Sequence, residues 1–255
     1  MPEALAELYL LYLLVWARLL GFTLAFPPLA LPGLPVLWRL GVAMSLSLFV
    51  TPLLPPDRPF SGGAWEWALT WAGEFTLGLG MGFVAGLVFQ ALRVAGQLMG
   101  LQMGFGMAEL LTLGGVPETM LAEFFFLLGT VLFFTTDAYQ YLIEALVRSY
   151  EVLPLGGAAV KGGAIWLTVK LVGGMLATAL QLAAPVLAVT VLIDASLGLL
   201  VRMVPQINVF MLGFPLKIGA SLLLLGLLAT TLGTVIGRLL QEVAHNLLLL
   251  TRGLS

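Results

Sequence analysis

Charged side chains in or beside long apolar runs are the residues of this chain whose types could do chemistry. Five stand out: Arg93, Asp137, Asp194, Arg202 and Lys217. Charges are costly in lipid, so such residues face protein partners or water. In a small-molecule or ion carrier, Asp194 and Lys217 would bind substrate or a proton. Otherwise they form an ion pair or mark helix ends at the membrane surface, which is the interpretation we favour.

Several kinds of site are excluded by residue type. The chain has no Cys and a single His, His245. It therefore lacks disulfides, thiolate or His-cluster metal sites and a cysteine nucleophile. There is no GxSxG, HExxH or P-loop motif. An intramembrane protease would use Asp137 and Asp194, but TTDAYQ and LIDASL are not a recognisable catalytic context. We expect no enzyme activity, no metal and no cofactor.

The composition is that of a membrane protein. Of the 255 residues, 60% are hydrophobic and 9% are charged, and the mean hydropathy is +1.08. Soluble domains have about 45–50% apolar and about 25% charged residues, and a soluble surface needs polar cover. We therefore predict an all-α protein that crosses the bilayer several times. With 11 Lys+Arg against 13 Asp+Glu, no basic face is available for a nucleic acid.

The elements that must position these charges are apolar helices. About 20 apolar residues can cross a bilayer, and prolines cannot lie densely inside one helix. We expect a helix over about 4–26, a proline-rich turn over 27–35, and about six long helices in all, some of them interrupted. The remaining runs are 40–56, 75–92, 94–108, 124–136 (extended to about 146), 171–193 and 218–237. The cationic residues are spread too evenly to assign an orientation.

Glycine and tryptophan patterns indicate packing surfaces. Glycines recur every four residues, which places them on one helix face and lets backbones approach closely; they are Gly78, Gly82, Gly86, then Gly96, Gly100, Gly104, and the pair Gly233 and Gly237. This spacing does not separate contacts within the chain from contacts between subunits. Clustered Trp65, Trp67 and Trp71 fit a membrane–water interface or core packing equally well.

Two segments carry the most specific pattern, residues 97–118 and 194–218. In the second, Pro205 ends or kinks one apolar helix and Pro215 constrains the start of the next. The amides of Gln206 and Asn208 can satisfy backbone groups freed at the turn between them. A short polar connector between two long apolar helices predicts a helical hairpin.

The second segment resembles the signature of the FliR family of flagellar export-gate proteins, with PQINVFMLGFPLK at 205–217 as the specific match. The stretch QMGFGMA at 102–108 fits the family in the expected order. The T-family components of injectisomes share the Pro-Gln-x-Asn part, whereas the GFPLK ending is similar to the flagellar branch. One departure is 109–115, where the family's Asp-Pro-like element is replaced by ELLTLGG.

This resemblance implies a FliP-like part over 1–160 and a FliQ-like helical hairpin over 161–255, with the break near 155–163. It also implies partners: five FliP-like and four FliQ-like subunits with one copy of this chain, and FlhA-like, FlhB-like and ATPase-like proteins. Together they would export unfolded flagellar proteins through the inner membrane at the basal body, without catalysing a bond change. An injectisome component is the alternative function, and a small-molecule carrier is less favoured.

The resemblance further implies two candidate sites. One is a pore plug near 105–117, whose candidate residues are Met103, Phe105, Gly106, Met107, Leu110, Leu111, Leu113, Gly114, Gly115 and Pro117. Flexible Met side chains suit a seal around varied chains, although each Met could equally fill a core. The other is the hairpin turn and subunit contact, with candidates Arg202, Pro205, Gln206, Asn208, Phe210, Gly213, Pro215 and Lys217.

Overall fold

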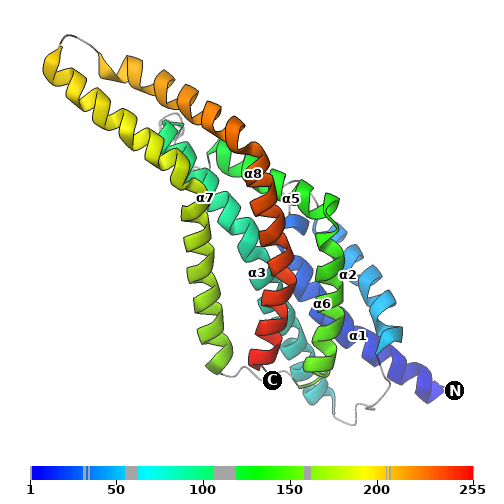
Figure 1. Cartoon of the computed structure of the whole chain (residues 1–255). Helices are drawn as coiled ribbons and strands as arrows, with labels where there is room; N and C mark the ends of the chain where they lie inside the picture. Colours follow the sequence, from blue (N-terminus) through cyan, green and yellow to red (C-terminus); the bar gives the residue numbers. More distant parts are fainter. Residues whose placement is uncertain are drawn as a thin grey trace. The chain divides into compact units, whose positions relative to one another are not determined.

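The computed structural model is almost entirely helical over the residues it describes, which are 2–30, 33, 35–54, 63–105, 119–157, 162–204, 206 and 208–254. No strand occurs among them, so the all-α prediction is confirmed. The elements in Figure 1 are α1 (Pro2–Ala25), η1 (Pro27–Leu29), α2 (Val36–Val50), η2 (Thr51–Leu53), α3 (Ala64–Met103), α5 (Met120–Thr135), α6 (Ala138–Val152), α7 (Gly162–Met203) and α8 (Val209–Leu254).

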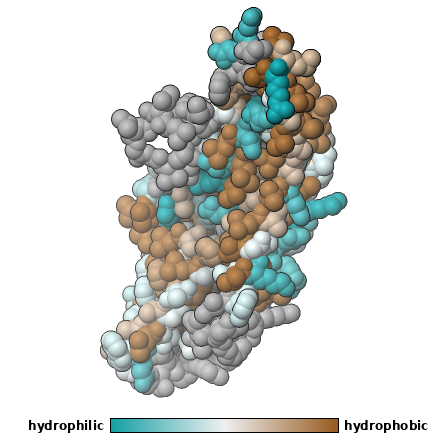
Figure 2. Space-filling model, turned by 90° about the vertical axis from the view of Figure 1, so that its left-hand side faces the viewer, coloured by the Kyte–Doolittle hydropathy of each residue, from teal (hydrophilic) through white to brown (hydrophobic). Residues whose placement is uncertain are grey.

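Five of the described helices are long and apolar enough to cross a membrane. The qualifying stretches are Leu8–Ala25, Val36–Leu53, Ala64–Met103, Trp166–Met203 and Met211–Ala229, and α5 with α6 counts as a sixth, broken span. This confirms the expectation of about six long apolar helices. Much of the face drawn in Figure 2 is brown, so hydrophobic side chains lie open over it.

The chain divides into two compact units, each built from separate segments. The first contains Met1–Leu87, Asp137–Val172 and Leu240–Ser255, and the second contains Val88–Thr136 and Gly173–Leu239. Three long helices, α3, α7 and α8, therefore contribute to both units. The division into a FliP-like part and a FliQ-like hairpin concerns a different property, likeness to other subunits, and stays a prediction.

In the first unit, α1 packs against α3 through glycines. A Cβ on Gly78 would overlap the carbonyl oxygen of Arg18, and one on Gly82 would overlap that of Phe22. In the reverse direction, Gly21 lies against the backbone of Phe75. The four-residue glycine spacing therefore serves contact between two backbones of the same chain, as expected for small residues between membrane helices.

The tryptophans of the cluster differ in their surroundings. The Trp71 ring lies 6.5 Å from that of Trp16 on α1 and stacks on Phe75 at 5.5 Å. These contacts join half-buried rings within the first unit. Trp65, in contrast, is exposed on the first turn of α3.

In the second unit, α5 packs along the last four turns of α3. Gly96 lies against the backbone of Leu121. The Phe89 ring meets Phe126 and Phe133 edge-on, at centroid distances of 6.3 and 5.6 Å. Edge-to-face geometry is the arrangement that aromatic rings favour, and it fixes the register of α5 on α3.

The structure corrects one element boundary. A single helix extending from residue 124 to about 146 was expected, but Asp137 separates α5 from α6. Its φ of 58° is left-handed, a conformation that Asp tolerates better than most residues and that cannot continue a helix. The expectation was wrong because the hydropathy of 124–146 carries no information about this one backbone angle.

Two expected runs proved to be one helix. The stretches around 75–92 and 94–108 join in α3, which passes through Arg93 without a break and ends at Met103. The start of α8 also differs from expectation, because the helix begins at Val209 and contains Pro215 in its second turn. Proline lacks the N–H that would bond four residues back, so α8 lacks the hydrogen bond from residue 215 to the Met211 carbonyl.

Candidate functional site

The connector between α7 and α8 is short, polar and exposed. Arg202, Gln206 and Asn208 are all exposed there. The Met211 amide donates a hydrogen bond to the Asn208 side-chain oxygen at 3.3 Å, so Asn208 is the N-cap of α8. This is the backbone-satisfying role expected of an amide at the turn. Pro205 lies outside the described residues, and the Phe210 side chain is likewise not described.

An ion pair joins the two helices of this hairpin. The Lys217 ammonium lies 2.6 Å from the Asp194 carboxylate, with Lys217 largely buried and Asp194 half exposed. Beside it, Gly213 is buried against Leu197, whereas Pro215 is exposed. Of the two interpretations of Asp194 and Lys217, the structure therefore has the ion pair.

The last turn of α3 ends in a glycine cap. The Phe105 amide donates to the Gly100 carbonyl at 3.0 Å, and the Gly104 amide donates to the Leu101 carbonyl at 3.1 Å. This pair of bonds is the Schellman motif, which requires a left-handed residue at the position Gly104 occupies; its φ is +95°. Met103 is fully buried and Phe105 is half-buried.

Gly104 is also in contact with the α7–α8 hairpin. The ring of Phe214 occupies the space that a Cβ on Gly104 would need. Phe214 precedes Lys217 by three residues, so both lie on neighbouring positions of one helix face. The two segments singled out from the sequence therefore meet at this point, within the second unit.

The chain returns to α3 at Thr119, the N-cap of α5. Thr119 is fully buried, its amide donates to the Gln97 side chain at 2.8 Å, and its hydroxyl accepts from Ala122. A Cβ on Gly100 would meet the Thr119 side chain. Both ends of the stretch between Phe105 and Thr119 are thus anchored on the last turns of α3. The plug candidates Gly106, Met107, Leu110, Leu111, Leu113, Gly114, Gly115 and Pro117 lie outside the described residues.

A further contact strengthens the α3–α5 pair. The Arg93 guanidinium lies 3.2 Å from the Glu123 carboxylate and 4.4 Å from the centre of the Phe126 ring. Burying a cation between a carboxylate and an aromatic face is favourable. Arg93 was singled out as a charge in apolar surroundings, and its partners are protein groups.

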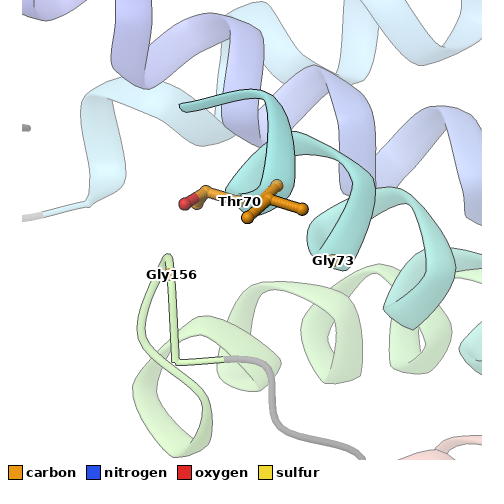
Figure 3. Close-up of a pocket in the computed structure, with 4 residues that line it drawn as sticks. Thr70, Gly73 and Gly156 are labelled. Carbon is orange, nitrogen blue, oxygen red and sulfur yellow. The ribbon is translucent and has the colours of Figure 1, made fainter. Parts of the chain in front are cut away.

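A small hollow of about 200 Å³ lies in the first unit, lined by Leu69, Thr70, Gly73 and Gly156. Figure 3 shows it between the start of α3 and the turn after α6. Its lining has no titratable side chain, so it offers no group for acid–base or metal chemistry. No cluster of three or more His, Asp or Glu that could hold a metal occurs in the described part of the chain.

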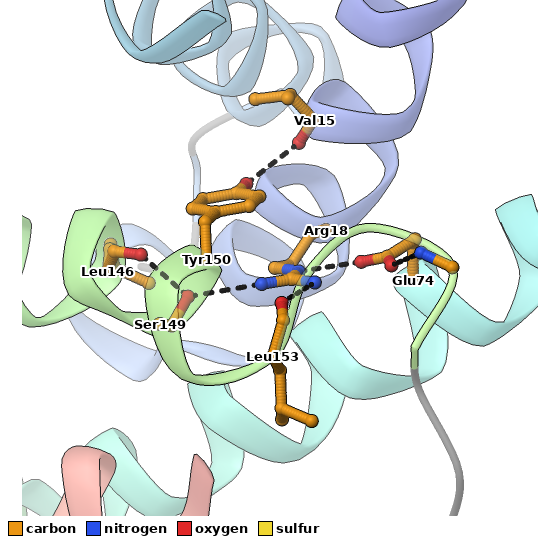
Figure 4. Close-up of polar contacts among 8 residues, drawn as sticks. Val15, Arg18, Glu74, Leu146, Ser149, Tyr150 and Leu153 are labelled. Carbon is orange, nitrogen blue, oxygen red and sulfur yellow. Dashed lines mark hydrogen bonds and ion pairs between the residues drawn. The ribbon is translucent and has the colours of Figure 1, made fainter. Parts of the chain in front are cut away.

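Beside this hollow is a buried polar cluster that sequence reasoning missed (Figure 4). Arg18 and Glu74 are both fully buried, with Nε 2.6 Å from the carboxylate. Arg18 also donates to the Leu153 carbonyl at 3.0 Å and to the Ser149 hydroxyl at 3.3 Å. The second Glu74 oxygen accepts from the Gly156 amide at 2.9 Å.

The cluster therefore ties α1, α3 and the end of α6 together. Arg18 satisfies the carbonyl of Leu153, the C-cap residue of α6, and Glu74 satisfies an amide in the turn that follows. The Arg18 guanidinium also lies over the Tyr150 ring at 4.1 Å. The available signal was that Arg18 and Glu74 each stand alone in apolar sequence, which indicates a buried partner without naming it.

Comparison with known proteins agrees with the family resemblance of residues 97–118 and 194–218. The family of bacterial export proteins, family 1, matches residues 9–243, a range that includes the three ion pairs described above, Gly104 and the α7–α8 connector. The chain belongs to the FliR/SctT family of bacterial export proteins. It is therefore a membrane component of a type III export apparatus, which works with other export components.

Individual members of the FliR/SctT family match most of the chain. Flagellar biosynthetic protein FliR of Escherichia coli (strain K12) is 30% identical over 235 residues, 91% of this chain and 89% of that protein. FliR of Bacillus subtilis (strain 168) is 27% identical over 257 residues, 97% and 98% of the two chains. Yop proteins translocation protein T of Yersinia pestis is 33% identical over 193 residues, 74% of each.

Proposed function

We propose that this chain is the FliR-like core component of a flagellar protein export gate in the inner membrane, at the basal body. Membership of the FliR/SctT family carries the proposal. The FliR proteins match up to 97% of the chain, whereas the injectisome protein T matches 74%. This favours the flagellar function over the injectisome function, which is the second candidate.

The α7–α8 hairpin supports assembly with FliP-like and FliQ-like subunits. Only 17% of the apolar stretch of α7 and 11% of that of α8 is buried within the chain. Mostly small, exposed residues follow one another along α7 at alternating spacings of three and four: Gly174, Ala177, Gln181, Ala184, Ala188, Val191, Ala195 and Gly198. This spacing keeps them on one face, and small residues allow another membrane helix to approach closely. The expected ratio is five FliP-like and four FliQ-like subunits to one copy of this chain.

The pore plug belongs to the same proposal. The residues that flank the stretch, Gly104 and Thr119, both lie at the last turns of α3. Irregular backbone at membrane depth is tolerable only against protein or water, and soft apolar contacts reform after a chain has passed. In this arrangement the gate catalyses no bond change, and FlhA-like, FlhB-like and ATPase-like partners deliver unfolded flagellar proteins to it.

Purification of the tagged chain from its native membrane tests the assembly. FliP-like and FliQ-like subunits should co-purify in one complex, and loss of the gene should abolish motility. Recovery of injectisome subunits would favour the second candidate. Recovery of the chain from its native membrane without any partner subunit would contradict both.

Deletion of Gly106–Gly115 tests the plug. We expect the variant complex to assemble, because Gly104 and Thr119, which flank the stretch, are left in place. We expect it to leak ions, because the residues that would close the pore are missing. The measurement is ion conductance, or growth in high salt, of cells that carry the assembled variant. If the variant is as tight as the parent, residues 105–117 form a packing loop instead.

A further inference from the structure

The ring of Phe214 lies directly over Gly104, at the point where the chain leaves α3. Gly104 holds this position for two reasons. Its φ of +95° is strained for any residue with a side chain, and the Phe214 ring fills the space that a side chain would occupy. The contact therefore depends on a glycine at one side and a large flat side chain at the other.

The position of Phe214 is itself fixed by its neighbours on the hairpin. The preceding residue, Gly213, is buried against Leu197 of α7. On the next turn, Lys217 binds Asp194 of α7 at 2.6 Å. These two contacts determine the rotation of α8 about its axis, and hence the direction in which the Phe214 ring points.

We propose that Phe214 is a positioning residue for the end of α3: its ring holds the glycine cap in place and so fixes the direction in which the chain leaves α3 at Phe105. This inference rests on the proposed function for the role of the plug, but the contact itself does not. Apart from the ring, the end of α3 is held by the two backbone bonds of its Schellman cap and, a turn earlier, by the contacts of Thr119 with Gln97 and Gly100. Helix ends fray where tertiary support is lost, so without the ring the turn at Met103 and Gly104 opens more often.

Thiol labelling tests the positioning directly, because the chain has no Cys of its own. Met103→Cys places a thiol in the last turn of α3, and Met99→Cys places one a turn earlier; both side chains are fully buried. In the assembled complex, Phe214→Ala should raise the maleimide labelling rate at position 103 by about tenfold or more, equivalent to about 1.4 kcal/mol. The rate at position 99 should not change.

Matched variants separate this role from general damage to the helix. Phe214→Tyr keeps the ring and should keep position 103 protected. Leu212→Ala, on the same turn of α8 but with an exposed side chain, should leave labelling unchanged. Should Phe214→Ala assemble poorly, Phe214→Leu is used instead, with an intermediate rate expected. An unchanged labelling rate at position 103 in Phe214→Ala or Phe214→Leu, or an equal rise at positions 103 and 99, would overturn the proposal.

Ion leakage then connects the contact to the gate. Phe214→Ala should raise the ion leakage of the complex, as the Gly106–Gly115 deletion does, and Leu212→Ala should leave it unchanged. If the deletion is tight while labelling at position 103 rises, Phe214 positions the end of α3 and the plug assignment fails. If the deletion leaks but labelling does not rise, the plug stands and the positioning role fails.

Discussion

The α1–α3 pair and the α7–α8 hairpin use glycine in opposite ways. Gly21, Gly78 and Gly82 each lie against the backbone of the partner helix, whereas Gly173 and Gly226 have nothing within 4 Å. The apolar stretch of α3 is 67% buried within the chain and that of α8 is 11% buried. The same residue type thus completes a packed core in one region and leaves a close-approach surface open in the other.

Charges differ between the two regions in a parallel way. Arg18 and Glu74 are fully buried, and both bind partners within the chain. Asp194 is half exposed, although it pairs with Lys217. The buried charges of the first region are thus paired within this chain, whereas the second region presents polar and apolar groups that suit additional helices.

The largest effect is expected from breaking the buried pair of the first region. Arg18→Ala leaves the Glu74 carboxylate buried without its cation, which costs about 3–5 kcal/mol. The amount of folded chain in detergent should fall sharply, as measured by fluorescence-detected size exclusion. Arg148→Ala is the matched control, because its pair with Glu144 is exposed and should contribute less than about 1 kcal/mol. Equal losses in both variants would contradict the distinction.

A smaller loss is expected from closing the space between α1 and α3. Gly78→Ala places a Cβ on the Arg18 carbonyl oxygen, which forces the two backbones apart. Overpacking of this kind costs about 1–3 kcal/mol, so the thermal unfolding midpoint of the chain in detergent should drop. A midpoint equal to that of the parent would mean that the two helices do not touch as described.

At the hairpin connector, the expected loss is about 1 kcal/mol. Asn208→Leu removes the side-chain cap of α8, and loss of an N-cap costs about 0.5–2 kcal/mol. Replacing Gln206 as well should lower the yield of assembled complex further. Asn208→Asp retains a capping oxygen and should retain assembly. If the double variant keeps full complex yield and motility, the connector is not a structural turn of the kind described.

The smallest effect on the chain alone is expected at the open glycines. Gly226→Ala adds a Cβ into empty space and removes a poor helix former, so the helix should gain about 0.5–1 kcal/mol. Assembly should nevertheless fall if a partner helix approaches there, so thermal unfolding of the chain and yield of the complex should move in opposite directions. Unchanged yield would show that no backbone approaches Gly226.

Composition and hydropathy predicted the class of fold, because burial in lipid demands long apolar runs whatever the contacts are. The glycine spacing predicted close helix packing, and the amide of Asn208 predicted a capped turn. The partnership of Arg18 with Glu74 was out of reach, because it joins residues 56 positions apart that only the packed helices bring together. The helix break at Asp137 was missed for the opposite reason, because it depends on the left-handed φ angle of a single residue.

Gly104 shows how one residue can be predicted for the wrong reason. Its place after Gly96 and Gly100 indicated a third packing glycine, yet it ends the helix instead. The packing expectation still holds in part, because the Phe214 ring occupies the adjacent space. Sequence spacing places a residue on a helix face only while the helix continues.

The lengths of the longest helices set a limit on how the chain can lie in a bilayer. At a rise of 1.5 Å per residue, the 46 residues of α8 extend about 69 Å, more than twice the roughly 30 Å of a hydrocarbon core. Matching that thickness by inclination alone would need a tilt of roughly 60°, beyond the usual range of 0–40°. Lipid tails can therefore solvate only part of α8, and the remainder must be solvated by headgroups, water or neighbouring protein.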